Sequence, residues 1–334
     1  MTINDIARLA GTSKSTVSRV LNHDPHVSDE TRRRVMDAVR RNHYQPNSIA
    51  RGLVQGATRL VALIISDIRN PYYSEVTWYI EKELEQQGYH MFLGCSGEDP
   101  EKERNFVDLA AQYNFAGAIV ISPTNEAYLL QSAPALGCPV ILLNRYIDDF
   151  AGDMLTTDNF HGGSLAAHHL LALGHRRVAV FSGDKNTTTH RDRRAGFVHA
   201  LSLGGVALPE AFSFTTRSLD MDSGHTLGSH LLSLGSAAPT ALFCTTDLMA
   251  IGLLQAYRNA GKSIPEDLSI IGFDDIPYAG LAGIGLTTIA QPYEQIGKLA
   301  VQMLLERINS PARPKRREIL DCQLISRAST GPCG

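Results

Sequence analysis

The chain opens with apolar residues that recur at the period of a helix. Between Ile3 and Ala10 they follow the i, i+3, i+4, i+7 spacing of an amphipathic helix. Gly11 interrupts that pattern, and Ser13 can cap a second helix through its hydroxyl. The second helix, 14–21, gathers its apolar residues on one face and leaves short polar and basic side chains off it. Two short helices joined by a Gly turn predict a helix-turn-helix, whose second helix can enter a major groove.

A third helix and a short isolated segment complete the N-terminal region. The third helix is expected after Ser28, with Asp29 and Glu30 in its first turn, where the helix dipole favours anions. Pro46 interrupts this pattern. The seven residues that follow, 47–53, are too few for a stable free helix.

From about residue 59 onward, continuous apolar runs alternate with helical patterns, and such runs are typical of strands buried on both faces. The expected strands are 60–66, 90–95, 117–122, 139–144, 177–183, 240–245, 268–273 and 318–325. The expected helices are 72–87, 101–113, 126–133, 161–173, 193–203, 222–234, 248–260 and 293–308. Repeated strand–helix units predict parallel α/β sheets, and about 275 residues suit two lobes better than one sheet.

Composition and charge narrow the class of protein. The chain has no run of about 18 apolar residues and no charged segment followed by an apolar one at its start, so neither a membrane span nor a secretory signal is expected. Five scattered cysteines without a CxxC pair fit reduced thiols in a cytosol. Residues 1–58 carry a net charge of +4 and the remainder −7. A basic head on an acidic body fits polyanion binding confined to the N-terminus.

Three motifs in the first 53 residues carry a family resemblance. They are ARLAGTSKSTVSRVLN, VSDETRRRV and NHYQPNSIARGL, in that order. The segment resembles the DNA-binding headpiece of the lactose-repressor/galactose-repressor (LacI/GalR) family. This resemblance implies DNA contacts from Lys14, Ser15, Thr16 and Arg19, and a guanidinium such as that of Arg19 can bridge guanine O6 and N7.

In that family the segment matching 47–53 is a hinge helix, which orders against the minor groove when paired with its dimer mate. The matching DNA-contacting positions are Asn47, Ala50 and Leu53. Leu53 matches the apolar wedge that levers open the central base step. Gly52 departs from the small side chains expected there, so the order of this hinge is expected to depend strongly on DNA.

The resemblance also implies a two-lobed, periplasmic-binding-protein-like body. The expected fold class is therefore α/β, with an N-terminal helix-turn-helix headpiece and a two-lobed parallel α/β body. The chain would cross between lobes near Asn159, Ala290 and Asp321. The expected limits are 1–58 for the headpiece with its hinge, 59–334 for the effector-binding and dimerisation domain, about 59–158 and 291–320 for the N-lobe, and about 159–290 and 321–334 for the C-lobe.

Candidate ligand-binding side chains follow the carboxyl ends of the expected strands, where parallel α/β sheets bind ligands. Tyr72 and Tyr73 follow the first strand and can stack on a sugar ring or a base, although either can instead serve the core. Asn144 follows the fourth strand. Asp247 and Asp274 follow two later strands, and Asp274 matches the ligand-binding aspartate of the family. A strand-end aspartate can alternatively cap the next helix.

The family pattern Arg-x-x-Gly-Phe falls on Arg193, Gly196 and Phe197, so the resemblance makes Arg193 an effector contact. Arginine clamps a carboxylate or phosphate bidentately, and it also binds sugar hydroxyls. A carboxylate such as that of Asp274 accepts hydrogen bonds from adjacent hydroxyls. The candidate set therefore suits a polar, hydroxylated ligand: a sugar, a sugar acid or a nucleoside.

These features predict a ligand-responsive transcription regulator, a repressor that binds a near-palindromic operator as a homodimer in the cytoplasm. The alternative is a solute-binding protein of a transport system, which fits the body but not the basic head. Catalysis is not expected, because GxSxG, HExxH and P-loop motifs are absent. No metal or cofactor is expected, since the adjacent His168 and His169 point differently on a helix.

Trp78, the only tryptophan, is expected near the dimer interface, with a partly exposed core position as the alternative. The ending LISRASTGPCG also resembles the C-terminus of the family. No leucine heptads follow it, so a tetramer built on a C-terminal coiled coil is not expected.

Overall fold

The computed structural model describes residues 1–21, 24–44, 58–124, 126–132 and 137–333. Its contacts divide the chain into two compact units, Met1–Thr58 and Arg59–Gly334. The described residues of the first unit form three short helices, α1 (Ile3–Leu9), α2 (Lys14–Leu21) and α3 (Asp29–Arg41). They enclose a small apolar core that includes Ile6, Val17 and Val35.

The turn between α1 and α2 is held from the third helix. Gly11 adopts a φ of +57°, which a side chain would strain, and this ends α1. The guanidinium of Arg34 in α3 donates to the carbonyl oxygens of Ala10 at 2.6 Å and Gly11 at 2.8 Å. These bonds satisfy carbonyls that the end of a helix leaves free, and they fix the approach of the two helices.

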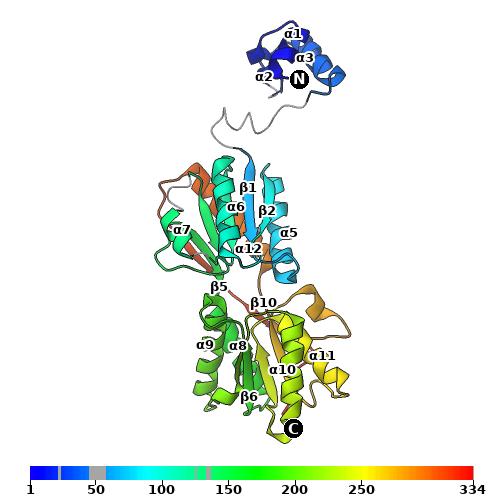
Figure 1. Ribbon diagram of the computed structural model, residues 1–334, viewed down its shortest axis with the longest axis vertical. Helices are drawn as coiled ribbons and strands as arrows, with labels where there is room; N and C mark the ends of the chain where they lie inside the picture. The colour runs from blue at the N-terminus through cyan, green and yellow to red at the C-terminus, as the bar shows by residue number, and fades with distance from the viewer. Residues whose placement is uncertain (22–23, 45–57, 125, 133–136, 334) are drawn as a thin grey trace. The chain divides into compact units, whose positions relative to one another are not determined.

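The second unit contains two six-stranded sheets, each the centre of one lobe (Figure 1). The N-lobe sheet has the order β11-β5-β4-β3-β1-β2, with all its pairs parallel. Its strands are β1 (Leu60–Ile65), β2 (His90–Cys95), β3 (Gly117–Ile121), β4 (Val140–Leu143), β5 (Asp153–Thr157) and β11 (Arg317–Leu320). Its helices are α5 (Pro71–Gln86), α6 (Pro100–Gln112), α7 (Glu126–Ser132) and α12 (Tyr293–Asn309).

The C-lobe sheet has the order β12-β10-β9-β8-β6-β7 and is parallel except for the antiparallel pair of β10 and β12. Its strands are β6 (Val178–Ser182), β7 (Ser213–Thr215), β8 (Ala241–Cys244), β9 (Ser269–Asp274), β10 (Thr287–Ala290) and β12 (Gln323–Ile325). Its α-helices are α8 (Asn159–Ala172), α9 (Thr188–Leu203), α10 (Met221–Ser233) and α11 (Asp247–Asn259).

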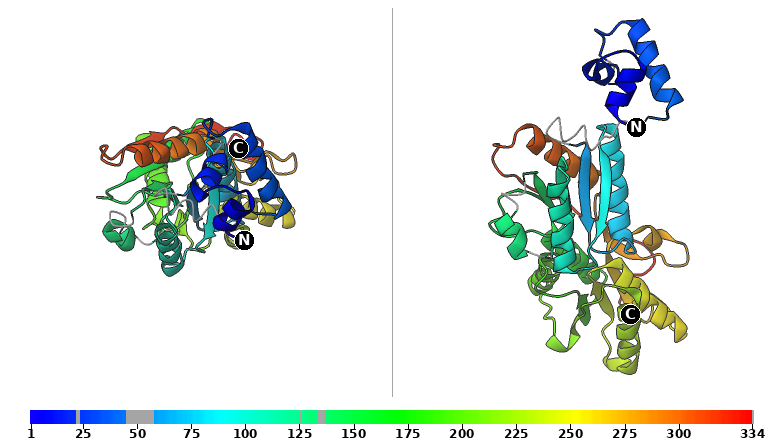
Figure 2. Two further views of the ribbon diagram at one scale, coloured as in Figure 1. Left: turned by 90° about the horizontal axis from the view of Figure 1, so that it is seen from above. Right: turned by 45° about the horizontal axis from the view of Figure 1, so that its top comes forward.

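Helices cover both faces of each sheet, and the alternation of side chains along the strands explains the layers (Figures 1 and 2). In β1, Val61 and Leu63 join the core under α5 and α12, whereas Ala62 and Ile64 join the core under α6. Strands buried on both faces in this way are near-continuous apolar runs, and this is why the sequence could reveal them.

The chain passes between the lobes three times: after Thr157, after Ala290 and after Leu320. The expectation of one final strand over 318–325 was wrong, because Leu320 pairs with Thr157 in one sheet while Gln323 pairs with Ala290 in the other. Strands β5, β7 and β10 were not predicted. They are only three to five residues long and rich in Thr and Ser, so they lack an apolar run. Among the residues that the structure describes, no helix is both long enough and apolar enough to cross a membrane.

Candidate functional site

The second helix of the headpiece presents polar and basic side chains to solvent. Lys14, Ser15 and Arg19 of α2 are exposed and Thr16 is half-buried, whereas the apolar residues of the same helix lie in the core. In a helix-turn-helix, side chains near the start of the second helix are those that reach base edges. The structure therefore leaves the predicted DNA-contacting residues of α2 accessible to a duplex.

Local interactions organise these side chains. Ser13 Oγ accepts a hydrogen bond from the Thr16 amide at 3.2 Å and lies 2.8 Å from the Ser15 hydroxyl. Arg19 Nε lies 3.9 Å from Asp24 Oδ2, and the Arg19 side chain is 67% exposed. An ion pair this long and this exposed is weak, so the guanidinium is available to a base or a phosphate.

The other predicted DNA contacts, Asn47, Ala50 and Leu53, lie outside the described residues. Their roles stay predictions.

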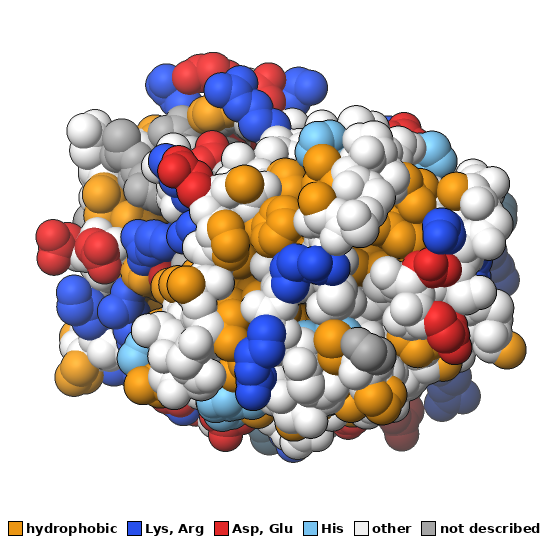
Figure 3. Space-filling model, turned by 90° about the horizontal axis from the view of Figure 1, so that it is seen from below, with side chains coloured by type: hydrophobic (Ala, Val, Ile, Leu, Met, Phe, Trp, Pro, Cys, Tyr) orange, Lys and Arg blue, Asp and Glu red, His pale blue; other side chains and the backbone are white. Residues whose placement is uncertain are grey.

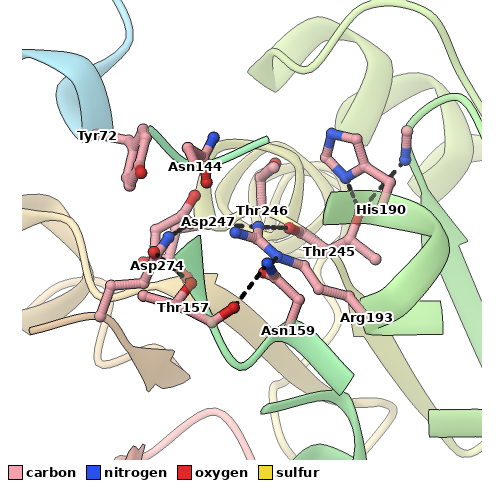
Figure 4. A network of polar contacts seen from close by, with 12 residues as sticks. Tyr72, Asn144, Thr157, Asn159, His190, Arg193, Thr245, Thr246, Asp247 and Asp274 are labelled. Carbon is pink, nitrogen blue, oxygen red and sulfur yellow. Dashed lines mark hydrogen bonds and ion pairs between the residues drawn. The ribbon is translucent and has the colours of Figure 1, made fainter. Parts of the chain in front are cut away.

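In the second unit, the carboxyl ends of the two sheets meet at a lobe junction, which includes Ser122, Asn144 and Thr157 of the N-lobe and Arg193, Thr245 and Asp274 of the C-lobe. Hydrogen bonds join the two sides. The hydroxyl of Tyr293, on α12 of the N-lobe, donates to the Asp274 carbonyl at 2.9 Å. Gln291, where the chain passes between the lobes, accepts from Thr157 Oγ1 at 3.0 Å and donates to Asp274 Oδ1 at 2.7 Å. Figure 4 shows Tyr72 and Asn144 on one side of this network and Arg193 with Thr245 on the other.

Arg193 is the centre of the polar network. Its Nε donates to Asn159 Oδ1 at 2.7 Å, and its Nη1 donates to the Thr245 carbonyl at 2.6 Å and to Asp274 Oδ1 at 3.3 Å. The guanidinium also lies 3.6 Å from the centroid of the Phe273 ring. Arg193 is only 3% exposed. These partners compensate a charge that would otherwise be costly to bury.

Asp274 combines a buried carboxylate with a strained backbone. Its φ of 121° is sparsely populated by residues other than glycine, and such conformations cluster at functional sites. Oδ1 accepts from Gln291 Nε2 at 2.7 Å as well as from Arg193, and the backbone carbonyl accepts from the Tyr293 hydroxyl at 2.9 Å. Burial raises the pKa of Asp274 to about 6, although Arg193 and Gln291 act in the opposite direction.

Asp247 lies in the interior of the C-lobe. Its Oδ1 accepts from the Thr288 hydroxyl at 2.5 Å, and its Oδ2 accepts from the Ile276 amide at 2.9 Å. The residue is 0% exposed, and burial, together with the charge of Asp274, raises the pKa of Asp247 to about 7. Both oxygens are thus engaged in holding β10 and the loop after β9. This geometry gives the predicted effector contact of Asp247 no support.

The two adjacent tyrosines have different settings. Tyr73 donates its hydroxyl to Ser122 Oγ at 3.2 Å, within the N-lobe, and Asn144 Nδ2 donates to the same oxygen at 2.7 Å. Tyr72 lines a small recess with Asn144 and Gln291, and burial, followed by the charge of Asp274, raises its pKa. Tyr72 and Asn144 lie next to the Arg193 network, whereas Tyr73 bonds to Ser122 within the N-lobe.

Sequence reasoning missed His190 and Gln291. His190 Nδ1 lies 3.0 Å from Thr245 Oγ1, and the ring is 4% exposed. Burial, then the charges of Arg193 and Arg145, lower the pKa of His190 well below its usual range, so the imidazole is neutral. Helix α9 begins at Thr188, five residues before the expected start, because its polar first turn carries no apolar periodicity. A spacing of three residues on that helix places His190 on the same side as Arg193.

The Arg-x-x-Gly-Phe pattern now has a physical explanation. Arg193 faces the junction, and Phe197 is fully buried in the C-lobe core. Gly196 lies where α9 meets α8, and a Cβ at this position would collide with the carbonyl oxygen of Phe160. The glycine permits the close contact between α8 and α9, and this contact fixes the position of Arg193 in the junction.

Together, the fold and these two sites define a helix-turn-helix protein with a two-lobed ligand-binding body. The family model for bacterial regulatory proteins of the lacI family matches residues 2–47, and the model for a periplasmic binding protein-like domain matches residues 167–330. The HTH-type transcriptional regulator DegA of Bacillus subtilis is 34% identical, over 99% of this chain and 98% of DegA. The ribose operon repressor of Haemophilus influenzae is 32% identical, over 98% of both chains.

Solved structures agree. The lac repressor dimer bound to operator and the anti-inducer ONPF superposes with a TM-score of 0.86 at 26% identity, over 99% of both chains. A LacI family transcriptional regulator from Enterococcus faecium with bound ribose gives a TM-score of 0.74 at 29% identity, over 82% of this chain and 100% of that one. The chain belongs to the lacI family of bacterial regulatory proteins, which confirms the resemblance seen in its first 53 residues. It is a DNA-binding transcriptional regulator under the control of a ligand.

Proposed function

We propose that this protein is a homodimeric repressor whose affinity for a near-palindromic operator is set by a small hydroxylated effector bound at the lobe junction. The observation that carries the proposal is that one chain contains both an exposed basic helix, α2, suited to a major groove, and a two-lobed body with a buried ion pair of Arg193 and Asp274. Proteins similar to this chain include a ribose operon repressor and a lac repressor dimer bound to operator.

DNA recognition is assigned to α2 and the hinge. Arg19 would bridge a guanine, Lys14, Ser15 and Thr16 would meet base edges and phosphates, and Leu53, with Asn47 and Ala50, would act in the minor groove. Charge supports confining this role to the headpiece, because residues 1–58 are basic overall and the body is acidic. On the face shown in Figure 3, basic side chains are scattered among hydrophobic and uncharged ones and form no continuous stripe.

Dimerisation is assigned to a surface that includes Trp78 on α5. Its side chain is 55% exposed, with its ring centroid 4.7 Å from that of Tyr79 and 5.2 Å from Lys82 Nζ. A large aromatic this exposed is a favourable anchor for a protein partner. Tyr278 and Leu281 of the C-lobe are also about half-exposed, at 48% and 54%, and can extend the same kind of contact.

The effector is assigned to Tyr72, Asn144, Arg193 and Asp274. The two side-chain donors to Asp274 reach Oδ1, so Oδ2 is the oxygen that can accept from ligand hydroxyls. Tyr72 supplies an aromatic surface. This combination suits a sugar or sugar derivative, and ribose is the ligand of one structural relative.

The protein is proposed to act in the cytoplasm, without a cofactor and without catalysis. The alternative of a solute-binding protein is less well supported, because the lacI family model matches residues 2–47 of the headpiece.

The test begins with selection of bound duplexes from a random DNA pool by the purified chain. Enrichment of a palindrome that Arg19→Ala abolishes and Arg40→Ala retains would support the proposal. Arg40 is a matched control because it is an exposed headpiece arginine paired with Asp37 on α3 rather than α2. The operator is then titrated in the presence of pooled sugars and sugar derivatives. Binding without an enriched sequence, or an operator affinity that no small molecule alters, would contradict it.

A further inference from the structure

Some buried polar atoms on elements that border the lobe junction have no partner. Among the residues that the structure describes, six buried side-chain atoms lack a hydrogen-bond partner, and four of them are Ser66 Oγ, Asn144 Oδ1, Arg145 Nε and Thr188 Oγ1. The first three follow β1 and β4 of the N-lobe, and Thr188 opens α9 of the C-lobe. Buried polar groups are normally paired, so unpartnered atoms on both sides of the junction favour a ligand that is bound between the lobes.

Arg145 is the available cation among them. Its side chain is 13% exposed, Nη1 lies 3.5 Å from the Pro123 carbonyl and Nη2 lies 3.5 Å from Glu98 Oε1, both at the outer limit of a hydrogen bond. Two arginines of α9, Arg193 and Arg194, are occupied elsewhere. Arg193 is held by its buried network, and Arg194 donates to Ser213 Oγ at 3.0 Å.

The loop that carries Arg145 contacts the start of α9 across the junction. The next residue, Tyr146, donates its hydroxyl to Asp192 Oδ2 at 3.1 Å and accepts from Arg191, both in the first turns of α9. The positive charge of Arg145 is also one of the causes of the lowered pKa of His190 on that helix.

The amino end of α9 has features that favour binding of an anion. This helix has 16 residues, its N-cap Thr187 makes no side-chain cap bond, and its first turn carries no acidic residue. Free amides and the helix dipole favour negative charge there. Thr188, with its unpartnered hydroxyl, is 9% exposed at this same end.

We propose that the effector carries an anionic group, a carboxylate or a phosphate, bound between the guanidinium of Arg145 and the amino end of α9. Hydroxyls of the same molecule reach Asn144 Oδ1 and Asp274. The effector class is thus a sugar acid or a sugar phosphate rather than a neutral sugar. This inference rests on the proposed function, because it places the charge of the effector within the same junction.

The first test uses inorganic phosphate as the probe for the anion site. Thermal midpoints of the full chain are measured in rising phosphate, with the ionic strength held constant by chloride, for wild type, Arg145→Gln and Arg194→Gln. Wild type and Arg194→Gln should show the same saturating rise, and Arg145→Gln should need at least tenfold more phosphate to reach it. Phosphate binding at the basic headpiece is common to all three proteins. Equal curves for all three would overturn the inference.

The second test uses a bacterial metabolite extract divided on an anion exchanger into neutral and retained fractions. Each fraction is assayed for its effect on the affinity of the full chain for the selected operator. Activity confined to the retained fraction supports the inference, and gluconate and glucose 6-phosphate then separate carboxylate from phosphate. Activity confined to the neutral fraction overturns it while leaving effector control intact. Operator binding that neither fraction alters counts against effector control itself, and the phosphate comparison then decides whether the anion site exists.

Discussion

The hydroxyl of Tyr146 donates to Asp192 Oδ2 at 3.1 Å, and this bond joins the loop after β4 in the N-lobe to α9 in the C-lobe. Two guanidinium groups flank the ring, with Arg317 at 4.9 Å and Arg191 at 5.6 Å from its centroid. Burial, followed by the charge of Asp192, raises the pKa of Tyr146, so the phenol stays protonated and remains a donor. The contact therefore stabilises the arrangement of the lobes seen here.

Tyr146→Phe removes this bond and keeps the ring. A hydrogen bond to a charged group contributes about 1.5 kcal/mol or more, so an effector that binds between the lobes should bind about tenfold more weakly. The measurement is effector titration of the operator complex by fluorescence anisotropy. Tyr128→Phe is the matched control, because the hydroxyl of Tyr128 donates to Asp108, another residue of the N-lobe. An equal loss of effector affinity in both variants would mean that the bond between the lobes does not contribute specifically to effector binding.

Asp24 should restrain Arg19 in the absence of DNA. The pair is 3.9 Å long, and a neutral side chain at 24 would release the guanidinium and remove a negative charge near the phosphates. Asp24→Asn is expected to tighten binding to operator and to scrambled duplex alike, more so at low salt. Arg19→Ala should instead cost about 1–3 kcal/mol on the operator and less on the scrambled duplex. Both are measured by anisotropy at two salt concentrations, with Asp37→Asn on α3 as the control. Tightening on the operator alone would contradict this account of Asp24.

The sequence predicted the elements whose apolar pattern is strong. Leu60–Ile65 and Gly117–Ile121 are buried on both faces, so their composition alone marks them as strands. Thr287 and Thr288 of β10 are equally buried, but their hydroxyls are paired with Arg327 and Asp247. Such a strand is stabilised by partners far away in the chain, which a local pattern cannot contain.

The candidate site divides in the same way. The position of Asp274 after a strand and the family pattern around Arg193 pointed to these two residues. The structure places Arg193 Nη1 3.3 Å from Asp274 Oδ1. The same logic selected Asp247, because a strand-end position does not reveal which way the side chain turns. The setting of His190 and the role proposed for Arg145 depend on the packing of one lobe against the other, and no spacing along the chain encodes that packing.

Gly196→Ala should disturb the junction from a distance. The added methyl group meets the Phe160 carbonyl, so α8 and α9 must separate, and overpacking of this kind costs about 1–3 kcal/mol. Urea unfolding measures the loss, and effector titration should show weaker binding because Arg193 moves with α9. Gly283→Ala is the control, since nothing lies within 4 Å of a Cβ there and its φ is not positive. Unchanged effector affinity in a destabilised Gly196→Ala would separate helix packing from the placement of Arg193.

Asp247 should make stability depend on pH in the sense opposite to a carboxylate whose pKa is lowered by folding. Its pKa is about 7 in the folded protein against the ordinary 3.8, so between these values the folded chain holds one more proton than the unfolded chain. The stabilisation is therefore fully present below about pH 4, and it is lost as the pH rises to 7, by up to about 1.4 kcal/mol per unit.

Asp247→Asn cannot titrate at this position. Urea unfolding from pH 5 to 8 should show wild type losing stability relative to this variant up to about pH 7, with a constant difference above it. Burial lowers the pKa of histidines such as His175, so these residues reduce the stability of the folded protein as the pH falls. Both proteins contain them, so their effect cancels in the difference between the two unfolding free energies. Asp222→Asn, at an exposed carboxyl, gives the baseline. A difference that stays flat from pH 5 to 7 would mean that Asp247 is ionised in its buried site, held by Thr288 and the Ile276 amide.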